Sequence, residues 1–558
     1  MSASTPVTDW FTEKSTIGDL PARAAGRWPD REALTFGDRR WSFAEVEAEV
    51  DRAARALVAL GLAPGDKVAL WLMNRPEWIF LLFGIIRIGA VIVPLNTRFR
   101  EDDMRFVVGH ANATTLIQSD RSGPIDFLAQ TRTVLPGLGA HAPGDPADPA
   151  FPDLRRVITI GSGPHEGVLW WEDCLARADE VPAAAVAARA AAVDPDGTAM
   201  IIYTSGTTGF PKGAMHGHCC IRAHTDRANR LGSTHLDVLL CYLPLFHLYG
   251  LAELALTFPI TGSRLVLTEG FDPEESVRLI ERERVTMVHG FDIHYQGLMD
   301  ARDRVQADVS SLRVGSIPAG TDATLPVVRR VLREFCPVVS AYGLTEGWCC
   351  GAIGFLDGSE EQRTHASGFP MPGYEFRIVD PETGEIQPTG TSGEISLRSY
   401  MVTQGYYRAP EQTAEAIDAD GWLRTGDMGI ARDDGYIRFL GRYKDMLKVG
   451  GENVSPLEVE GYLLERHPLL QVAIVGYPDR RLDEVPIAFV VVAPDCRLGE
   501  EELEAAIVES CRGRLASFKI PRRVFVVDAL PMTASGKLQK HLLRDLALER
   551  LGVAEADY

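Results

Sequence analysis

The sequence predicts an α/β protein, because helices and short apolar strands alternate along most of the chain. A helix followed by a strand is predicted at Asp51–Leu60 and Lys67–Leu72, at Pro273–Arg284 and Val285–Val288, and at Pro326–Phe335 and Val338–Ser340. Strands of this kind are apolar on both faces, which is typical of sheets covered by helices on both sides. The Ala-rich stretch Val181–Val193 is expected to form a surface helix or a linker.

The length of the chain and a change in its pattern predict two domains. The chain has 558 residues, 46% of them hydrophobic, whereas single cores rarely grow past about 250–300 residues. From about Gly393 strands and turns replace the earlier alternation, and a compact tail follows Gly441. The tail is predicted to hold helix Pro456–Arg466, strands Gln471–Val475 and Ile487–Val492, and helix Glu500–Arg514. We expect a large N-terminal domain of packed α/β sheets with a small β subdomain over residues 1–441, and a small C-terminal α+β domain over 442–558.

Charge and cysteine usage narrow the class of protein. The net charge of −20 argues against nucleic acid or an anionic membrane as the main partner, because like charges repel. The N-terminus lacks a basic segment followed by an apolar run, so no secretory signal is expected. Nine cysteines include two adjacent pairs and no C-x-x-C, which favours neither a zinc site nor a disulfide framework. A cytoplasmic protein is expected, and a homodimer stays open.

One apolar stretch, Trp78–Leu95, approaches the length of a membrane span. Arg87 lies at its centre, and Gly84, Gly89 and Pro94 interrupt it. A buried helix that runs into a buried strand explains this pattern better than a transmembrane segment does.

A loop rich in hydroxyl groups and glycine follows the predicted strand Thr198–Tyr203. Its N–H and O–H groups can surround a polyphosphate, glycine allows close approach of the backbone, and the lysine adds a positive charge. It differs from the G-x-x-x-x-G-K-[ST] loop, because glycine follows the lysine. The residues predicted to bind phosphate are Thr204, Ser205, Gly206, Thr207, Thr208, Gly209 and Lys212.

The run Tyr203–Gly213, YTSGTTGFPKG, resembles the YTSGTTG-x-PKG signature of the acyl-adenylate-forming superfamily. That superfamily includes acyl-CoA synthetases, adenylation domains and beetle luciferases. The resemblance extends from about Trp41 to Lys540, and six further segments follow in the family's order. It implies an AMP-forming acid–thiol ligase that uses ATP, Mg²⁺ and coenzyme A, with a small C-terminal domain that turns about hinge residue Lys444.

Four of these segments imply sites for the nucleotide and the metal. Tyr342 and Gly343 in AYGLTEG are expected to face adenine, Thr345 the phosphate, and Glu346 the Mg²⁺, which prefers carboxylate and phosphate oxygens. The turn Ala319, Gly320 and Thr321 resembles the family's adenine turn more loosely, because the usual pattern is Gly-Gly-Ala-Pro. The resemblance assigns the ribose diol to Asp427 and Arg442, in GWLRTGD and GRYKD.

The remaining segments imply the acyl site and the moving parts. LPLFHLYG resembles the segment that lines the acyl pocket, with His247 as a wall that rearranges between half-reactions. Lys537, in PMTASGK, matches the catalytic lysine that bridges the carboxylate and the α-phosphate. After rotation about Lys444, the face with Lys448, Gly450 and Gly451 replaces the Lys537 loop, and Lys519 meets a phosphate of coenzyme A. The acyl pocket is assigned to Phe246, Tyr249, Phe291 and Trp348, with Tyr295, His289, Asp292 and His294 nearby in sequence.

The aromatic lining favours a medium-chain, cyclic or aromatic carboxylic acid over a very long acyl chain. Carrier-protein loading and amide formation share the first half-reaction and stay open, although no Gly-Gly-x-Ser-Leu carrier motif follows Lys537. A non-catalytic nucleotide sensor is a remote alternative, because both the phosphate loop and the lysine loop are intact in sequence.

Overall fold

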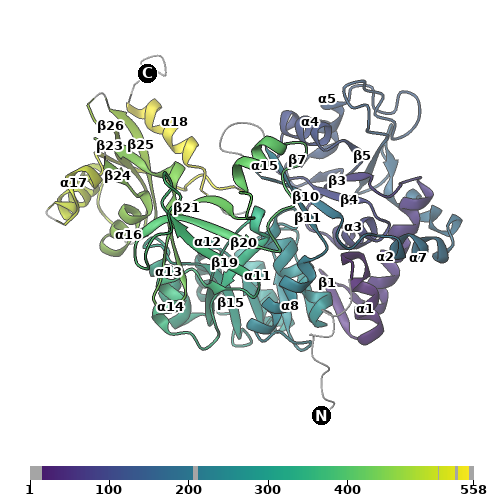
Figure 1. Ribbon diagram of the computed structural model, residues 1–558, viewed down its shortest axis with the longest axis horizontal. Coiled ribbons are helices and arrows are strands. Elements are labelled where there is room, and N and C mark those ends of the chain that lie inside the picture. Colours follow the sequence, from purple (N-terminus) through teal and green to yellow (C-terminus); the bar gives the residue numbers. More distant parts are fainter. Residues whose placement is uncertain are drawn as a thin grey trace, which may run out of the picture.

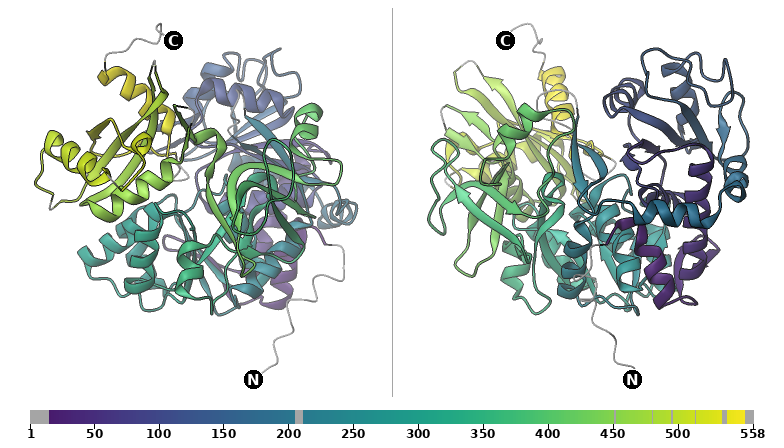
Figure 2. Two further views of the ribbon diagram at one scale, coloured as in Figure 1. Left: turned by 60° about the vertical axis from the view of Figure 1, so that its left-hand side comes forward. Right: turned by 45° about the vertical axis from the view of Figure 1, so that its right-hand side comes forward.

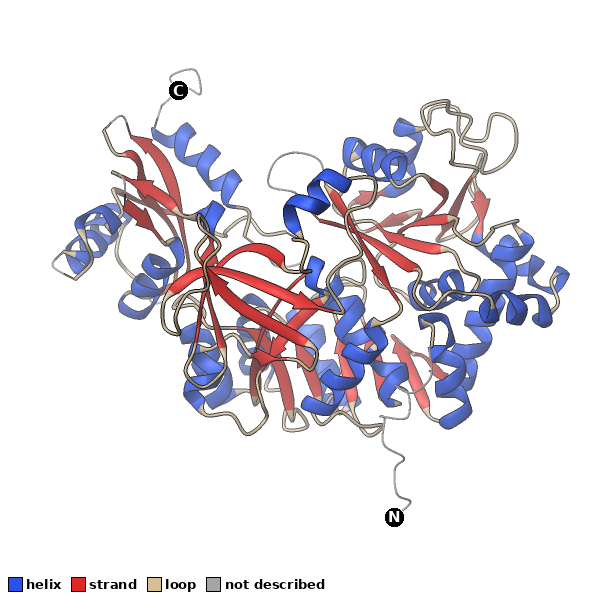
Figure 3. Ribbon diagram, viewed as in Figure 1, coloured by secondary structure: helices blue, strands red, loops and turns tan. Residues whose placement is uncertain are grey.

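The computed structural model describes residues 15–204, 211–450, 452–479, 481–494, 496–512, 514–533 and 538–551. Ser205–Gly209, Gly451 and Lys537, all predicted site residues, lie outside these ranges. The predicted α/β fold is confirmed: two large, mainly parallel sheets are flanked by helices, and two smaller sheets follow them in the chain (Figures 1 and 3).

The first large sheet is parallel from β16 to β1 and antiparallel at both edges. Its order is β18 (Phe369–Pro370), β17 (Cys349–Ile353), β16 (Val338–Leu344), β15 (Val314–Pro318), β14 (Met287–His289), β12 (Val238–Cys241), β13 (Arg264–Leu267), β1 (Glu32–Phe36) and β2 (Arg39–Ser42). β16 is longer than predicted, because its ladder with β15 continues to Ala341 and its ladder with β17 to Leu344.

The second large sheet ends at the antiparallel pair that carries the predicted phosphate loop. Its order is β11 (Lys212–Gly217), β10 (Thr198–Thr204), β4 (Val91–Pro94), β3 (Lys67–Trp71), β5 (Ala113–Ser119), β8 (Arg156–Ile160) and β9 (Leu169–Trp170). A small hairpin, β6 (Arg121–Ser122) and β7 (Ile125–Asp126), follows β5.

Helices cover both sheets, and α3 lies at the centre of the core. The helices of this region are α1 (Leu20–Arg27), α2 (Phe43–Ala59), α3 (Pro76–Arg87), α4 (Glu101–His110), α5 (Phe127–Val134), α6 (Trp171–Ala176), α7 (Ala183–Ala191), α8 (Cys220–Arg230), α9 (Leu248–Gly250), α10 (Thr257–Thr261), α11 (Pro273–Glu283), α12 (Asp292–Val305), α13 (Leu325–Glu334), α14 (Glu360–His365) and α15 (Pro410–Ala416). α2 starts earlier than predicted, because Ser42 and Glu45 form a capping box.

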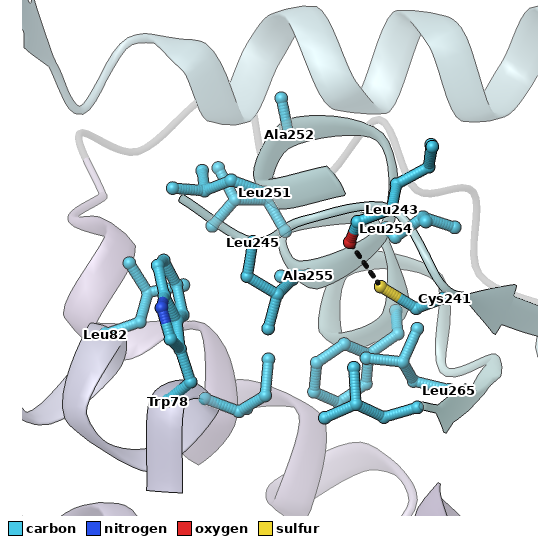
Figure 4. Close-up of a cluster of buried hydrophobic side chains, with 14 of the residues drawn as sticks. Trp78, Leu82, Cys241, Leu243, Leu245, Leu251, Ala252, Leu254, Ala255 and Leu265 are labelled. Atoms are coloured by element: carbon cyan, nitrogen blue, oxygen red, sulfur yellow. Dashed lines mark hydrogen bonds between the residues drawn. The ribbon is translucent and has the colours of Figure 1, made fainter. Parts of the chain in front are cut away.

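The apolar stretch Trp78–Leu95 is a buried helix followed by a buried strand, as predicted. Arg87 lies inside because it forms a bidentate ion pair with Glu47, at 2.8 and 2.7 Å. Trp78 and Leu82 of α3 point toward Leu245 and Leu251, in the segment predicted to line the acyl pocket (Figure 4). That segment therefore rests on the main core. Among the described helices, none is long and apolar enough to cross a bilayer.

The third sheet is antiparallel and packs on the edge of the first. It comprises β19 (Tyr374–Val379), β20 (Ser392–Ser399), β21 (Leu423–Ala431) and β22 (Ile437–Arg442). Ile378, Ile395 and Ile437 share a small core with Tyr342 and Ala352 of the first sheet. Residues 423–442 are thereby brought against β16.

The fourth sheet and its helices form a separate body with cores of its own. We call the described residues 447–551 the C-terminal lobe and those of 15–442 the N-terminal lobe. The C-terminal lobe holds β23 (Leu447–Val449), β24 (Glu452–Val454), β25 (Leu469–Asp479), β26 (Asp483–Val492), β27 (Arg523–Val526), α16 (Pro456–Arg466), α17 (Glu500–Cys511) and α18 (Lys540–Leu551). It lies beside α13 and β22, which α16 contacts, away from the β3–β5 side of the second sheet (Figures 1 and 2).

Candidate active site

The two ends of the predicted phosphate loop are held by paired strands. Thr204, the last residue of β10, stands opposite Lys212, the first residue of β11. Thr204 Oγ1 also donates a hydrogen bond of 3.5 Å to the Lys212 carbonyl. The antiparallel pair therefore fixes where the loop leaves and rejoins the sheet.

Tyr342, predicted to face adenine, and Asp427 and Arg442, predicted to bind the ribose, meet as a connected group. Asp427 on β21 stands opposite Arg442 on β22. Arg442 Nε lies 2.9 Å from Asp427 Oδ1, and Tyr342 Oη donates to Asp427 Oδ2 over 2.8 Å. Burial, reinforced by the Asp427 charge, raises the pKa of Tyr342 well above its usual value. The carboxylate is thus held by one hydrogen bond and one ion pair and is only 2% exposed.

Two glycines in the predicted adenine site have no room for a side chain. A Cβ on Gly343 would lie 1.3 Å from the carbonyl oxygen of Cys349. Gly320 has a φ of +109°, and a Cβ there would lie 2.2 Å from Ser367 Oγ. Ser367 Oγ donates to the Ala319 carbonyl over 2.6 Å. Thr321 Oγ1 is hydrogen-bonded to Thr324 Oγ1 at 3.2 Å, which closes the turn.

The predicted metal ligand and the predicted phosphate lysine share one neighbour that the sequence analysis missed. Tyr406 Oη donates to Glu346 Oε1 over 3.0 Å. The Lys212 ammonium lies 5.0 Å from the centre of the Tyr406 ring. Glu346 follows Thr345 in a short 3₁₀ turn after β16. A lone carboxylate with one oxygen held by a phenol suits Mg²⁺, which takes few protein ligands beside phosphate oxygens.

Tyr249 and Phe291 of the predicted acyl pocket contact one another. Their ring centres are 5.3 Å apart. The buried Tyr249 hydroxyl is hydrogen-bonded to both the carbonyl and the hydroxyl of Ser316, each at 3.0 Å. His289 Nδ1 is hydrogen-bonded to the same Ser316 hydroxyl at 2.7 Å. Burial lowers the pKa of His289 to about 4, so this imidazole is neutral near pH 7.

Two neighbouring side chains support this region. Asn74 donates to the Leu243 carbonyl and accepts from the Leu245 N–H, at 3.0 and 2.8 Å. His247 caps α9 by accepting from the Tyr249 N–H over 3.4 Å, so the structure shows a positioning contact for it. His294 likewise accepts from the Phe291 N–H. Tyr295, close in sequence, is fully buried and donates to the Val288 carbonyl.

Trp348 directly follows the AYGLTEG motif, and its side chain lies in the protein interior. Its side chain is 0% exposed, and its indole N–H donates to His224 Nε2 over 3.0 Å. Its ring contacts are His216 and His224, whereas Tyr249 pairs with Phe291. Phe246 is buried. The pocket roles of Trp348 and Phe246 stay predictions.

A buried ion pair links the acyl segment to the backbone that follows Glu346. Arg227 Nη1 donates to Glu253 over 2.8 Å, and its other nitrogens donate to the Trp348 and Cys350 carbonyls. Glu253 lies in the π-helix Leu251–Ala255, next to the thiols of Cys349 and Cys350. Because Arg227 compensates the glutamate, this cluster does not require a cation.

The predicted hinge residue Lys444 and the predicted residues of the C-terminal lobe are exposed or partly exposed. Lys444 and Lys448 are exposed, and Gly450, with a φ of +61°, begins the turn between β23 and β24. Lys519 forms an ion pair with Glu458 at 2.6 Å within the lobe. A role of Lys519 with coenzyme A would require this pair to open.

The lobes touch beside the predicted lysine loop and also beside the predicted adenine turn. Arg98 Nη1 donates to the Met532 carbonyl over 2.8 Å, five residues before Lys537. Gly461 of α16 lies against Asp322, just after the predicted adenine turn; a Cβ on Gly461 would be 2.5 Å from the Asp322 carbonyl carbon.

The matches to known families agree with this arrangement. A model described as AMP-binding enzyme matches residues 21–407, and one described as AMP-binding enzyme C-terminal domain matches residues 458–537. The chain belongs to the AMP-binding enzyme family. It is an acyl-CoA synthetase, which activates a carboxylic acid with ATP as the acyl-adenylate and transfers the acyl group to coenzyme A.

Relatives and solved structures match this member of the family along nearly its whole length. A Mycobacterium tuberculosis ligase, named for joining coenzyme A to a 7a-methyl-1,5-dioxo-octahydroindenyl propanoyl group, is 37% identical over 94% of this chain and 97% of its own. The mitochondrial medium-chain acyl-CoA ligase of Danio rerio is 30% identical over 97% of this chain and 90% of its own. The crystal structure of the anthranilate CoA ligase AuaEII with anthranoyl-AMP superposes with a TM-score of 0.85 at 28% identity, covering 98% and 100% of the two chains.

Proposed function

We propose that this acyl-CoA synthetase acts on a medium-chain, cyclic or aromatic acid whose body is uncharged. The observation that carries the proposal is the neutral character of the Tyr249–Phe291 region. Tyr249 and Phe291 are aromatic, His289 is neutral, and the nearby Arg227 is already paired with Glu253. A second carboxylate on the acid would meet no unpaired cation among the described residues named here and would be costly to bury.

The names of some relatives support this substrate class, whereas one solved structure of similar coverage is a synthetase for o-succinylbenzoate, a diacid. The supporting names include a medium-chain ligase, a ligase for a bicyclic propanoate and a ligase seen with an aromatic acyl-adenylate. All three acids consist of one carboxylate on a largely apolar or ring-shaped body.

In the first half-reaction, the substrate carboxylate attacks the α-phosphorus of ATP and pyrophosphate leaves. The step brings anions together, so catalysis depends on positioning and on charge neutralisation. We assign the bridge between the carboxylate and α-phosphate oxygens to Lys537, the leaving phosphates to Lys212 and the Thr204–Gly209 loop, and the ribose to Asp427 with Arg442. Glu346 would hold Mg²⁺, which neutralises phosphate charge when bound.

In the second half-reaction, the thiol of coenzyme A attacks the acyl carbonyl and AMP leaves. We propose that the chain divides after Gly441 and that the C-terminal domain turns about Lys444 between the two steps. β22 ends at Arg442 and the next sheet begins at Leu447, which supports a hinge in this short connection. The turn would withdraw Met532 and the Lys537 loop and bring Lys448 and Gly450 to the site.

The decisive experiment measures pyrophosphate release with ATP and Mg²⁺ for paired acids, with and without coenzyme A. Octanoate is compared with octanedioate, and cyclohexanecarboxylate and benzoate are included. We expect kcat/KM for octanoate to exceed that for octanedioate by about 100-fold, because the second carboxylate would be buried without a partner. A preference for the diacid would overturn the neutral pocket. Turnover that coenzyme A does not sustain would point to a carrier protein or an amine as acceptor.

We also propose a cytoplasmic location. The nine cysteines are all free thiols, which suits a reducing compartment. Whether the protein is a homodimer is a separate question, which sedimentation of the purified protein would answer.

A further inference from the structure

We propose that Tyr406 is a positioning residue for adenylate formation, which orients Glu346 through its hydroxyl and seats Lys212 on its ring. One side chain would thereby set both the carboxylate for the metal and the ammonium for the leaving phosphates. The inference rests on the roles proposed above for Glu346 and Lys212.

The hydroxyl and the ring of Tyr406 contact different residues. The hydroxyl donates to Glu346 Oε1 over 3.0 Å, while the ring centre lies 5.0 Å from Lys212 Nζ. Glu346 and Lys212 are both described, and no direct ion pair joins them. Tyr406 thus lies between the Glu346 carboxylate and the Lys212 ammonium. Because these two groups do not pair directly, each can bind a third partner.

The backbone around Tyr406 is fixed to the strand that leaves the phosphate loop. Tyr406 forms a β-bridge with Ala214 of β11, and the Tyr407 N–H donates to the Gly213 carbonyl over 2.8 Å. The Tyr406 N–H donates to Thr413 Oγ1 over 2.9 Å. The side chain is 9% exposed. The backbone position of Tyr406 is therefore set by the sheet.

The segment also holds the backbone of the metal motif. The N–H of Thr403, three residues before Tyr406, donates to the Glu346 carbonyl over 2.7 Å. Glu346 is thus held at its main chain by Thr403 and at one carboxylate oxygen by Tyr406. A carboxylate oriented by an outer hydrogen bond binds a cation more tightly, because less rotational freedom is lost on binding.

The test compares Tyr406→Phe, which loses only the hydroxyl, with Tyr406→Leu, which also loses the ring. The matched control is Tyr407→Phe, because the adjacent Tyr407 hydroxyl donates to Asn112 instead. Each variant is titrated with Mg²⁺ in ATP–pyrophosphate exchange, and Mn²⁺ binding in the presence of ATP is measured by electron paramagnetic resonance. Transfer from supplied acyl-adenylate to coenzyme A is measured separately.

We expect Tyr406→Phe to raise the half-saturating Mg²⁺ and the Kd for Mn²⁺ about tenfold, the loss typical of a hydrogen bond to a charged group. Tyr406→Leu should in addition raise the KM for ATP severalfold, because Lys212 loses its ring partner. Acyl transfer from the supplied adenylate should stay within about twofold of wild type, as should every parameter of Tyr407→Phe.

Unchanged Mn²⁺ binding in Tyr406→Phe would overturn the inference, and so would an equal loss in both half-reactions. Glu346→Gln separates this failure from failure of the proposed function. If Glu346→Gln weakens Mn²⁺ binding and Tyr406→Phe does not, only the role of Tyr406 is wrong. If Glu346→Gln leaves Mn²⁺ binding intact, the metal role of Glu346 itself is wrong.

Discussion

The nucleotide-binding side of the site and the docked C-terminal lobe are held in different ways. Asp427 and Arg442 stand opposite each other on adjacent strands, and Tyr342, which packs in a core shared by two sheets, donates a hydrogen bond to Asp427. The geometry of this group is therefore built into two sheets. The C-terminal lobe meets the rest through the Arg98–Met532 hydrogen bond beside the lysine loop, and through α16, whose Gly461 lies against Asp322 and which also contacts α13 and β22.

The way in which each region is held agrees with its proposed role in the two half-reactions. AMP must stay bound through both half-reactions, and its proposed partners are fixed by ladders that cannot open locally at low cost. The lysine loop is needed in the first half-reaction, and its lobe is docked by contacts that can be exchanged. The predictions below test this division by measuring both half-reactions for each variant.

The largest effect is expected for Lys537→Ala. Loss of a cation placed at the transition state should lower adenylate formation by about 10²–10³-fold, as for a single oxyanion donor. Transfer from supplied acyl-adenylate to coenzyme A should be nearly unchanged. ATP–pyrophosphate exchange and single-turnover thioester formation measure the two steps. An equal loss in both would mean that the lysine loop does not leave the site.

Asp427→Ala should affect both half-reactions, unlike Lys537→Ala. It removes the proposed ribose partner and leaves Arg442 and Tyr342 without their carboxylate, so we expect about a 100-fold loss of kcat/KM in each step. Asp433→Ala, an exposed aspartate between β21 and β22, serves as control. A loss confined to the first step would contradict the view that this group serves throughout.

Gly461→Val should block the observed docking without unfolding the lobe. The new side chain would collide with the Asp322 backbone, which belongs to the other lobe. We expect adenylate formation to fall about tenfold, while acyl transfer is maintained, because a shift of about 1.4 kcal/mol in a two-state equilibrium is tenfold. Gly499→Ala is the control, since a Cβ at Gly499 meets nothing closer than 3.9 Å. Equal losses in both steps would indicate general damage.

Arg98→Ala should give the smallest effect. It removes one exposed charged donor from the Met532 carbonyl, so we expect adenylate formation to fall about threefold. Arg100→Ala, two residues away, tests for a general loss of positive charge. A decrease in acyl transfer that matches the decrease in adenylate formation would show that Arg98 does not favour one orientation.

Contiguous motifs allowed specific predictions for much of the site. The Gly-, Ser- and Thr-rich loop before Lys212 and the run around Tyr342 combine residue types that suit phosphate, adenine and Mg²⁺ within a few positions. Gly343 illustrates why such a run tolerates little change, since a side chain would overlap the Cys349 carbonyl. The α/β fold was also predictable, because helix and strand periods alternate regularly along the chain.

Tyr406 and Trp348 show what the sequence could not reveal. Tyr406 lies 60 positions from Glu346, and its Gly-Tyr-Tyr surroundings contain no recognisable chemical pattern. Trp348 follows Glu346 closely, yet its φ of +60° and its hydrogen bond to His224 place the indole in the interior. The direction of the Trp348 side chain therefore depends on His224 of α8 and not on residues nearby in the sequence.

The sequence by itself determined the class of fold, the chemistry of the motifs and the residues that would carry it, because these follow from residue types at short spacing. Only the tertiary structure decided which distant side chains hold them: Asp427 to Arg442 by strand register, Glu346 to Tyr406 across the edge of β11, and Gly461 against Asp322 between lobes. Such contacts depend on how sheets pack, and packing is a property of the whole chain.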